Sequence, residues 1–194
     1  MEVKNKVLVV VGPSGVGKDT LMQKVFEKFP EKFRKGVTHT SRKMREGEKE
    51  GFNYYYVSKE EFLKLRDEDK LVENNCYNGN YYGLSKMELE NGTKLDKIVY
   101  FIIDIHGAHS IHKLNIPANY LCILPPSKET LLKRLQGRGT EAADVIKGRL
   151  EIAEKELTAI TEAPFFNLKV VNDDLNKAVE ELAGKLKEVY PQLK

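Results

Sequence analysis

Residues 6–21 read KVLVVVGPSGVGKDTL and join an apolar segment to a glycine-rich loop. Val7–Val11 are five apolar residues in succession, a pattern that predicts a strand buried on both faces of a parallel sheet. Residues 12–18 fit the GxxxxGK spacing of a phosphate-binding loop, and a helix is expected at 19–29. The glycines let backbone N–H groups point inward at phosphate oxygens, while the helix N-terminus and Lys18 add positive charge. The stretch therefore predicts a nucleoside triphosphate site in an α/β fold.

The bulk properties are those of an ordinary globular protein. The chain has 194 residues, 41% of them hydrophobic, with a formal net charge of +3. This mild charge suits small anions and is too weak to indicate nucleic acid. Cys76 and Cys122 fit no metal-binding spacing, which favours reduced thiols. Without a signal sequence or a membrane-length apolar segment, we expect a cytoplasmic protein with no membrane association and no obligate protein partner.

The segment 34–53, RKGVTHTSRKMREGEKEGFN, lacks an apolar period and is rich in charge, hydroxyl groups and glycine. It is either a solvated loop or an anion pocket, because Arg42 and Arg45 carry guanidinium groups that suit phosphate. The following segments predict a small α+β insertion between core elements. They are a strand at 54–57, a capped helix at 58–67, a hairpin at 71–83 and a second capping box at 85–88. Glu73 interrupts the first strand of this hairpin, and an isolated strand glutamate usually faces water.

The core pattern returns at 98–105, IVYFIIDI, which predicts a second buried strand followed by a short helix from 106. Asp104 lies near the carboxyl end of this strand, where open parallel sheets bind ligands. Further strands are expected at 119–124 and 168–171, and a terminal amphipathic helix after 172–174.

Two helices expected at about 127–138 and 140–161 carry three arginines, Arg134, Arg138 and Arg149. These arginines are either surface charge or part of an arm, hinged at Gly137 and Gly139, that closes over bound phosphates. The P-loop upstream favours the arm.

From about residue 6 to residue 190, the chain resembles the guanylate kinases. The motifs that carry the resemblance occur in family order: GPSGVGK (12–18), THTSRKMREGE (38–48), NYYYVSKEEF (53–62), ENNCYNGNYYG (73–83), DIHGAHSI (104–111), LQGRGTE (135–141) and VVND (170–173). The resemblance implies a P-loop three-layer α/β fold with a central parallel sheet, an α+β GMP-binding insertion and a helical lid. The expected single domain has a core at about 1–33, 89–126 and 161–194, the insertion at 34–88 and the lid at 127–160. The implied reaction transfers the γ-phosphoryl group of ATP to GMP and yields ADP and GDP.

The resemblance also implies three sets of site residues. The expected catalytic residues are Lys18, Arg42, Arg45, Arg134, Arg138 and Arg149. Those expected to bind ATP are Gly12, Pro13, Ser14, Gly15, Val16, Gly17, Lys18, Asp19, Thr20, Arg134, Arg138, Asn172 and Asp173. Those expected to bind GMP are Thr38, Arg42, Arg45, Tyr54, Glu73, Tyr82, Gly83, Ser85 and Asp104. Mg²⁺ is expected to accompany ATP, with Asp19 as its candidate protein ligand, either directly or through water.

Three positions depart from the family pattern. Asp19 stands where the motif has Ser or Thr, Leu84 stands where the family has Ser or Thr near the base, and Ile102 replaces a frequent Asp. Two other functions remain open, a non-catalytic guanylate-kinase-like module that binds proteins and a kinase for another nucleoside monophosphate. A GTP-hydrolysing switch is set aside because the chain has no Asn-Lys-x-Asp segment. Whether dGMP also serves as a substrate is left open.

Overall fold

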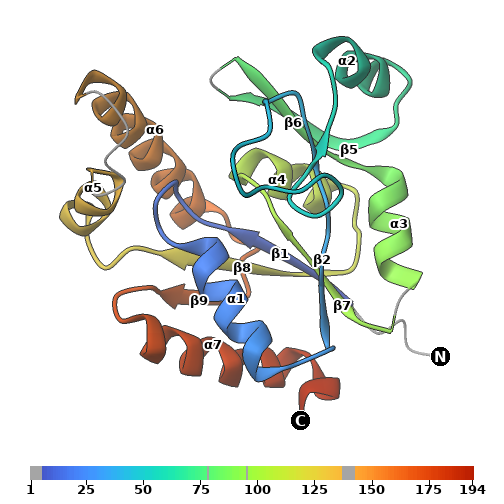
Figure 1. The fold of residues 1–194 in the computed structure, drawn as a ribbon. Coiled ribbons are helices and arrows are strands. Elements are labelled where there is room, and N and C mark those ends of the chain that lie inside the picture. Colours follow the sequence, from blue (N-terminus) through green and yellow to red (C-terminus); the bar gives the residue numbers. More distant parts are fainter. Residues whose placement is uncertain (1–5, 78, 95, 137–142) are drawn as a thin grey trace. The chain divides into compact units, whose positions relative to one another are not determined.

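The computed structural model of the chain describes residues 6–77, 79–94, 96–136 and 143–194. The chain divides into two compact units, and Figure 1 labels the helices and strands of both. Unit 1 comprises the residues up to Leu8, Phe33–Phe101 and His106–Ala118. Unit 2 comprises Val9–Lys32, Ile102–Ile105 and Asn119–Lys194.

The main sheet has five strands in the order β2-β7-β1-β8-β9. Their bounds are β2 Phe33–Lys35, β7 Ile98–Ile102, β1 Val7–Val11, β8 Ala118–Leu124 and β9 Leu168–Val171. The pairs β2–β7 and β8–β9 are parallel. Every residue of β1 is buried, which confirms the expectation of a strand covered on both faces. Because the paired strands β2–β7 and β8–β9 are parallel, the chain must cross over between the members of each pair, and helices lie in both connections.

Unit 2 carries the helices that follow the P-loop and the last strands. They are α1 Lys18–Lys28, α5 Lys128–Gln136, α6 Ala143–Glu162, α7 Leu175–Val189 and the 3₁₀ turn Pro191–Leu193. Helices α1 and α7 pack side by side, as Figure 1 shows. The Lys187 ammonium lies 5.7 Å from the centroid of the Phe29 ring at this contact. Asp174 caps α7 by accepting a hydrogen bond from the Lys177 N–H, as the sequence predicted.

Unit 1 contains a second sheet of four strands in the order β4-β3-β6-β5. The strands are β3 His39–Thr40, β4 Tyr55–Tyr56, β5 Leu71–Tyr77 and β6 Asn80–Ser85. Its helices are α2 Lys59–Asp67, α3 Lys86–Lys94 and most of α4 Ile105–Lys113. Phe62 of α2 is fully buried and stacks on Tyr81 of β6, so this small sheet has an aromatic core of its own.

Three sequence expectations were wrong in detail. Residues 34–53 were interpreted as either a solvated loop or an anion pocket with no apolar period, and no strand was expected there, but β2 and β3 fall partly or wholly in this segment. The strand expected at 98–105 ends at Ile102, and α4 already begins at Ile105. The second capping box is only half formed, because the Glu88 N–H donates to the Ser85 hydroxyl while the Glu88 carboxylate binds elsewhere.

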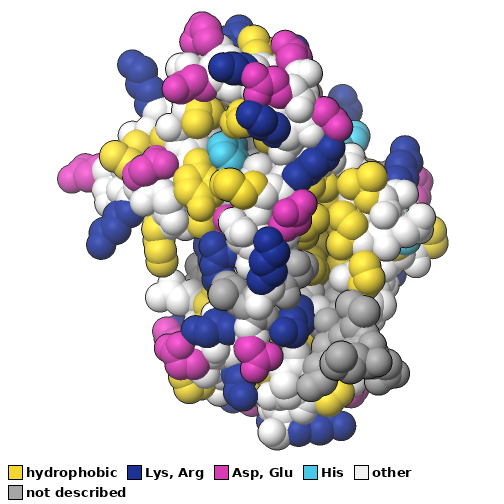
Figure 2. Space-filling model, turned by 90° about the vertical axis from the view of Figure 1, so that its right-hand side faces the viewer, with side chains coloured by type: hydrophobic (Ala, Val, Ile, Leu, Met, Phe, Trp, Pro, Cys, Tyr) yellow, Lys and Arg dark blue, Asp and Glu magenta, His cyan; other side chains and the backbone are white. Residues whose placement is uncertain are grey.

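Among the described residues, no helix is long and apolar enough to cross a membrane. Basic and acidic side chains are interspersed on the face drawn in Figure 2, as expected for a chain with a small net charge.

Candidate active site

The P-loop of unit 2 joins β1 to α1 and has the backbone conformation that its glycines permit. Gly15 and Gly17 have φ values of 85° and 91°, in the left-handed region that favours glycine. A Cβ on Gly12 would lie 2.6 Å from the Ile123 carbonyl oxygen, so no larger residue fits there. The Lys18 ammonium folds back and donates to the carbonyl oxygens of Gly12 at 2.6 Å and of Pro13 at 3.2 Å. The lysine charge is therefore held over the loop itself.

Two side chains from the C-terminal half of the chain hold the P-loop in place. The Asn172 amide donates to the Val16 carbonyl oxygen at 2.8 Å, and Asn172 is 6% exposed. A Cβ on Gly17 would lie 2.7 Å from this amide nitrogen, so the contact also requires glycine at 17. The Glu156 carboxylate on α6 accepts a hydrogen bond from the Ser14 N–H at 3.2 Å. The loop is thus fixed both from α6 and from the residue that follows β9.

Arg134, Asn172 and Asp173, three residues expected at the ATP site, lie together. The Arg134 guanidinium donates to the carbonyl oxygens of Asn172 at 2.7 Å and of Asp173 at 3.2 Å. This contact ties the end of α5 to the segment that follows β9. Arg138 lies outside the described residues, and Arg149 is part of α6 although its side chain is not described.

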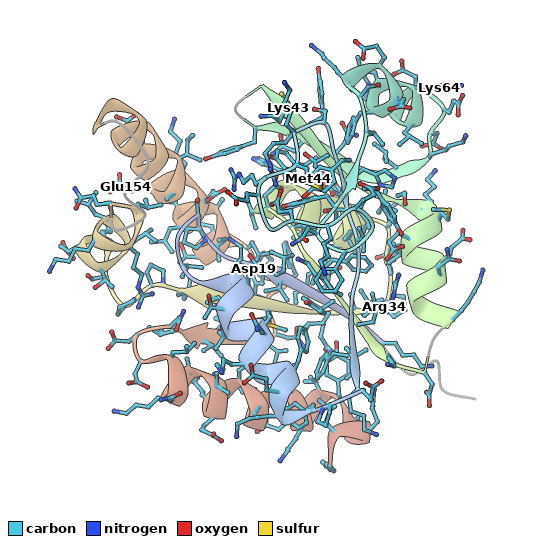
Figure 3. All side chains as sticks on the ribbon, viewed as in Figure 1. Asp19, Arg34, Lys43, Met44, Lys64 and Glu154 are labelled. Carbon is cyan, nitrogen blue, oxygen red and sulfur yellow. The ribbon has the colours of Figure 1, made fainter. Side chains whose placement is uncertain are left out.

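Asp19 and Thr20 are both exposed in the first turn of α1, and Figure 3 labels Asp19 there. Among the described residues, no three His, Cys, Asp or Glu side chains gather as a metal cluster. Mg²⁺ in nucleotide sites is usually held by one or two carboxylates, waters and the phosphates of the nucleotide. A single exposed carboxylate at the start of α1 is compatible with such a Mg²⁺ ion, whose other ligands would be water and the phosphates of ATP.

A cluster of charged and aromatic side chains in unit 1 surrounds Arg42. The Arg42 guanidinium donates to both carboxylate oxygens of Glu48, at 2.7 and 3.0 Å. Glu48 also accepts from the Arg45 N–H and from the Tyr56 hydroxyl, both at 2.7 Å. Burial alone would raise the pKa of Glu48, but these hydrogen bonds outweigh it and hold the pKa at about 2. Glu48 is thus an internal anion bound to one of the arginines expected to bind phosphate.

The aromatic residues of this cluster extend from Arg42 toward β6. The Arg42 guanidinium carbon lies 5.5 Å from the Tyr54 ring centroid and 5.9 Å from that of Tyr56. Tyr54 in turn meets Tyr82 edge to face, with centroids 6.0 Å apart. Three residues expected to hold the GMP phosphate, Arg42, Tyr54 and Tyr82, are therefore brought together. Arg45 is exposed, and its backbone N–H joins it to the same cluster through Glu48.

Glu73 is buried, with only 7% of its surface exposed, although an isolated strand glutamate usually faces water. Leu71 pairs with Ser85 and Glu73 with Leu84, so the pairing advances by two residues on β5 and by one on β6. Such a bulge bends a strand and changes the direction of its side chains. Glutamate side chains are rarely buried to this degree, which makes this position a candidate for ligand recognition.

The other residues expected to bind GMP lie in different settings. Thr38 is 9% exposed and precedes β3, and its carbonyl oxygen accepts from the Tyr55 N–H. Gly83 is buried on β6, where a Cβ would lie 2.8 Å from the Glu73 carbonyl oxygen. Ser85 is 4% exposed, and its hydroxyl serves the start of α3. Asp104 belongs to unit 2, two residues beyond the end of β7.

Glu88 is a buried carboxylate that the sequence suggested only as a helix cap. It accepts from the Val37 N–H at 3.0 Å and from the Tyr55 hydroxyl at 3.3 Å. The guanidinium of Arg34, labelled in Figure 3, lies 2.8 Å from the same carboxylate. These contacts fix the backbone immediately before Thr38. Glu88 could not be recognised from local pattern, because it binds residues that only the tertiary fold brings close.

Fold and site together define a P-loop nucleotide-binding protein of the α/β class, with a second polar cluster in a separate unit. A sequence-family model described as guanylate kinase matches residues 4–189. The guanylate kinase of Schizosaccharomyces pombe is 41% identical over 179 residues, covering 92% of this chain and 89% of the yeast protein. That of Synechocystis sp. is 42% identical over 180 residues, covering 93% and 92% of the two chains. The chain belongs to the guanylate kinase family.

The fold agrees with this assignment. The crystal structure of guanylate kinase from Anaplasma phagocytophilum superimposes with a TM-score of 0.71 at 26% identity, covering 98% of this chain and 88% of that one. The family, the α/β P-loop fold with its central parallel sheet and the kinase class expected from the sequence are confirmed.

Proposed function

We propose that this chain transfers the γ-phosphoryl group of ATP to GMP, with the P-loop binding ATP and the unit 1 cluster binding GMP. Family membership supports the reaction. The observation that carries the choice of GMP is the buried carboxylate of Glu73, in the same unit as an arginine–tyrosine cluster suited to a phosphate. A nucleoside monophosphate site needs a group that hydrogen-bonds the base and a cluster that binds the phosphate.

Glu73 suits guanine because of the donors that this base presents. The N1–H and 2-amino groups of guanine are adjacent, and a carboxylate accepts from both in a charge-assisted pair. Adenine presents an acceptor at N1 and would leave the carboxylate without that bond. A site built around buried hydrogen-bonding groups rejects analogues that leave those groups unpaired.

The chemical step is an in-line displacement that needs no strong base. An oxygen of the GMP phosphate, already anionic, forms a bond to the γ-phosphorus, and the bond from phosphorus to the β–γ bridging oxygen breaks. ADP leaves with the electron pair of that bond. Lys18 and the P-loop N–H groups position the donor, while Arg42, Arg45 and Arg134 neutralise charge on the phosphates.

Mg²⁺ bound with ATP would add charge neutralisation at the β- and γ-phosphates. Asp19, in the first turn of α1, is the residue that we propose would hold it, directly or through water. The remaining sequence expectations also stay predictions: the lid at 127–160, the insertion at 34–88, their closure over both nucleotides, and a cytoplasmic location. Closure would bring these arginines, which are dispersed along the sequence, to one phosphate chain.

A substrate panel tests the proposal. The purified chain is supplied with ATP and Mg²⁺ and with GMP, dGMP, IMP, AMP, UMP or dTMP in turn, and the diphosphate product is measured. We expect GDP formation to exceed formation of the other ribonucleoside diphosphates by orders of magnitude. Glu73→Gln should weaken use of GMP by about 10- to 100-fold, because glutamine cannot accept from both guanine donors.

Two further results separate the alternatives. Lys18→Met should abolish transfer while the free energy of unfolding changes by no more than about 1 kcal/mol. A chain that binds neither ATP nor GMP in calorimetry and makes no diphosphate would instead be a non-catalytic module of the same fold. Preferred use of another monophosphate would retain the kinase reaction and remove GMP as its substrate.

A further inference from the structure

The first turn of α4 lies directly against the side chain of Glu73 within unit 1. Gly107 is buried, and a Cβ built on it would lie 2.8 Å from Glu73 Oε2, 3.0 Å from Cδ and 3.3 Å from Cγ. All three of the nearest atoms belong to that one side chain. Real Cβ atoms essentially never approach another heavy atom within 3.0 Å, so any residue larger than glycine would displace the carboxylate.

Glycine is not required here by the backbone. Gly107 is absent from the residues with positive φ, and it is the third residue of the nine-residue helix α4. Glycine is disfavoured in helices relative to alanine, because it gains more conformational freedom on unfolding. Glycine is therefore needed at this position because it has no Cβ, and its conformational freedom is not the reason.

We propose that Gly107 is a positioning residue that sets the place and angle of the Glu73 carboxylate for guanine recognition. The proposal rests on the proposed function, which assigns Glu73 to the guanine edge. The helix backbone at Gly107 packs directly against the carboxylate and limits where it can lie. The bulge in β5 sets the side-chain direction from the other end.

An alanine at this position has a specific expected effect. The atom that its methyl group would meet is the far end of a flexible side chain, so the carboxylate moves and the backbone stays. A displacement of this kind weakens one or both hydrogen bonds to the base. Misplacing a reacting or recognising group by about 1 Å costs on the order of 100-fold in rate. We therefore expect Gly107→Ala to lower kcat/KM for GMP by roughly 10- to 100-fold, mainly through KM, with ATP binding unchanged.

The preference for GMP over IMP measures whether the Glu73 carboxylate is correctly positioned. IMP has the same N1–H and lacks the 2-amino group, so the ratio of the two kcat/KM values reports the second hydrogen bond to Glu73. Gly107→Ala should narrow this ratio by about tenfold. A merely structural role would lower both values equally and leave the ratio unchanged.

Two glycines supply matched controls. Gly184→Ala places the same methyl group on α7 with no atom within 4 Å, and should leave both kinetics and fold intact. Gly92→Ala crowds the Val99 methyl groups at 3.0 Å, in the same unit but away from Glu73. It should leave the GMP to IMP ratio unchanged, whatever its effect on the unfolding temperature.

A double-mutant cycle with Glu73→Asp completes the test. Aspartate is one methylene shorter and withdraws from the space that the added methyl group would fill. Gly107→Ala should therefore have little further effect in the Glu73→Asp background, and the double variant should fold even if the single Gly107→Ala variant does not.

Several outcomes would overturn the inference. They are an unchanged GMP to IMP ratio in folded Gly107→Ala, full additivity in the cycle, and failure of the double variant to fold. If Glu73→Gln uses GMP normally, the guanine assignment itself fails and the inference fails with it. A normal Gly107→Ala beside an impaired Glu73→Gln would overturn this inference alone.

Discussion

The Arg42 guanidinium donates to both carboxylate oxygens of Glu48, at 2.7 and 3.0 Å. The Arg42 side chain is 12% exposed and that of Glu48 18%, so the pair is largely screened from water. The Arg45 N–H and the Tyr56 hydroxyl complete the coordination of the carboxylate. An arginine expected to bind the GMP phosphate is thus oriented by an anion of the chain itself.

We expect Glu48→Gln to raise KM for GMP by about tenfold and to leave KM for ATP unchanged. Glutamine offers one acceptor in place of two and loses the charge, so Arg42 is no longer fixed in one rotamer. A hydrogen bond to a charged group is worth about 1.5–3 kcal/mol, which corresponds to tenfold or more in affinity. Steady-state kinetics with each substrate varied in turn measures this. Glu27→Gln, which breaks the exposed pair with Lys24, is the control and should change neither constant.

The same pair should make the stability of the protein depend on pH in acid. The pKa of Glu48 is about 2 in the folded chain and near 4.5 without these contacts. Because the folded-state pKa is depressed, the contribution is complete above about pH 4.5 and is lost as pH falls toward 2. Wild type should exceed Glu48→Gln in free energy of unfolding by about 1–2 kcal/mol at pH 7.

Urea denaturation at pH 7, 5, 4 and 3 tests this dependence on pH. The difference between the two proteins should shrink steadily below pH 4.5, since glutamine resembles the protonated acid. A difference that stays constant down to pH 3 would contradict the assigned hydrogen bonds.

The sequence predicted the elements whose signals are local. The strand Val7–Val11, the P-loop, the Ser58 capping box of α2 and the hairpin of β5 and β6 all follow from short patterns and were found. The strands β2 and β3 were missed, because they have three and two residues and lie in a charged segment. Their strand conformation comes from pairing with distant partners such as β7 and β6.

The sequence identified which residues belong to the candidate site, but it revealed few of the contacts that these residues make. Resemblance pointed to Glu73, but its burial depends on a bulge in β5 and on the approach of α4, which no local pattern reveals. Asn172 was expected beside adenine, a role that stays a prediction, and its amide binds the Val16 carbonyl oxygen across 156 residues of sequence. Such long-range pairings are set by the fold, and sequence spacing carries little information on them.

Asn172→Ala should destabilise the chain by about 1–3 kcal/mol and weaken ATP binding. The substitution leaves the buried Val16 carbonyl oxygen without its donor, and an unsatisfied buried group costs free energy in this range. It also removes the side chain against which Gly17 packs, so the P-loop loses a support. Thermal denaturation and calorimetric titration with ATP measure the two effects. Unfolding at the wild-type temperature with intact ATP affinity would show that the contact is dispensable.

Asp19 is exposed in the first turn of α1, directly after the P-loop lysine. A serine there would offer magnesium a neutral ligand, whereas aspartate places a negative charge near the expected β- and γ-phosphates. Two like charges about 4 Å apart repel by about 4 kcal/mol at an effective dielectric constant near 20. The repulsion is removed if Mg²⁺, or a water bound to it, lies between carboxylate and phosphate. ATP binding should therefore depend steeply on Mg²⁺, and metal-free ATP should bind poorly.

Asp19→Ser should bind metal-free ATP more tightly than wild type and respond less to Mg²⁺, while still forming GDP. Asp19→Asn keeps the shape and removes the charge, so it should behave like the serine variant if repulsion is the cause. Calorimetric titration of ATP with and without Mg²⁺ compares all three proteins without relying on turnover. An identical Mg²⁺ dependence in all three would mean that Asp19 acts only as a favourable charge at the helix N-terminus, worth a few tenths of a kcal/mol to about 1 kcal/mol of stability. In that case the metal would be held by the phosphates and water alone, and the unfolding temperature of Asp19→Asn should fall slightly.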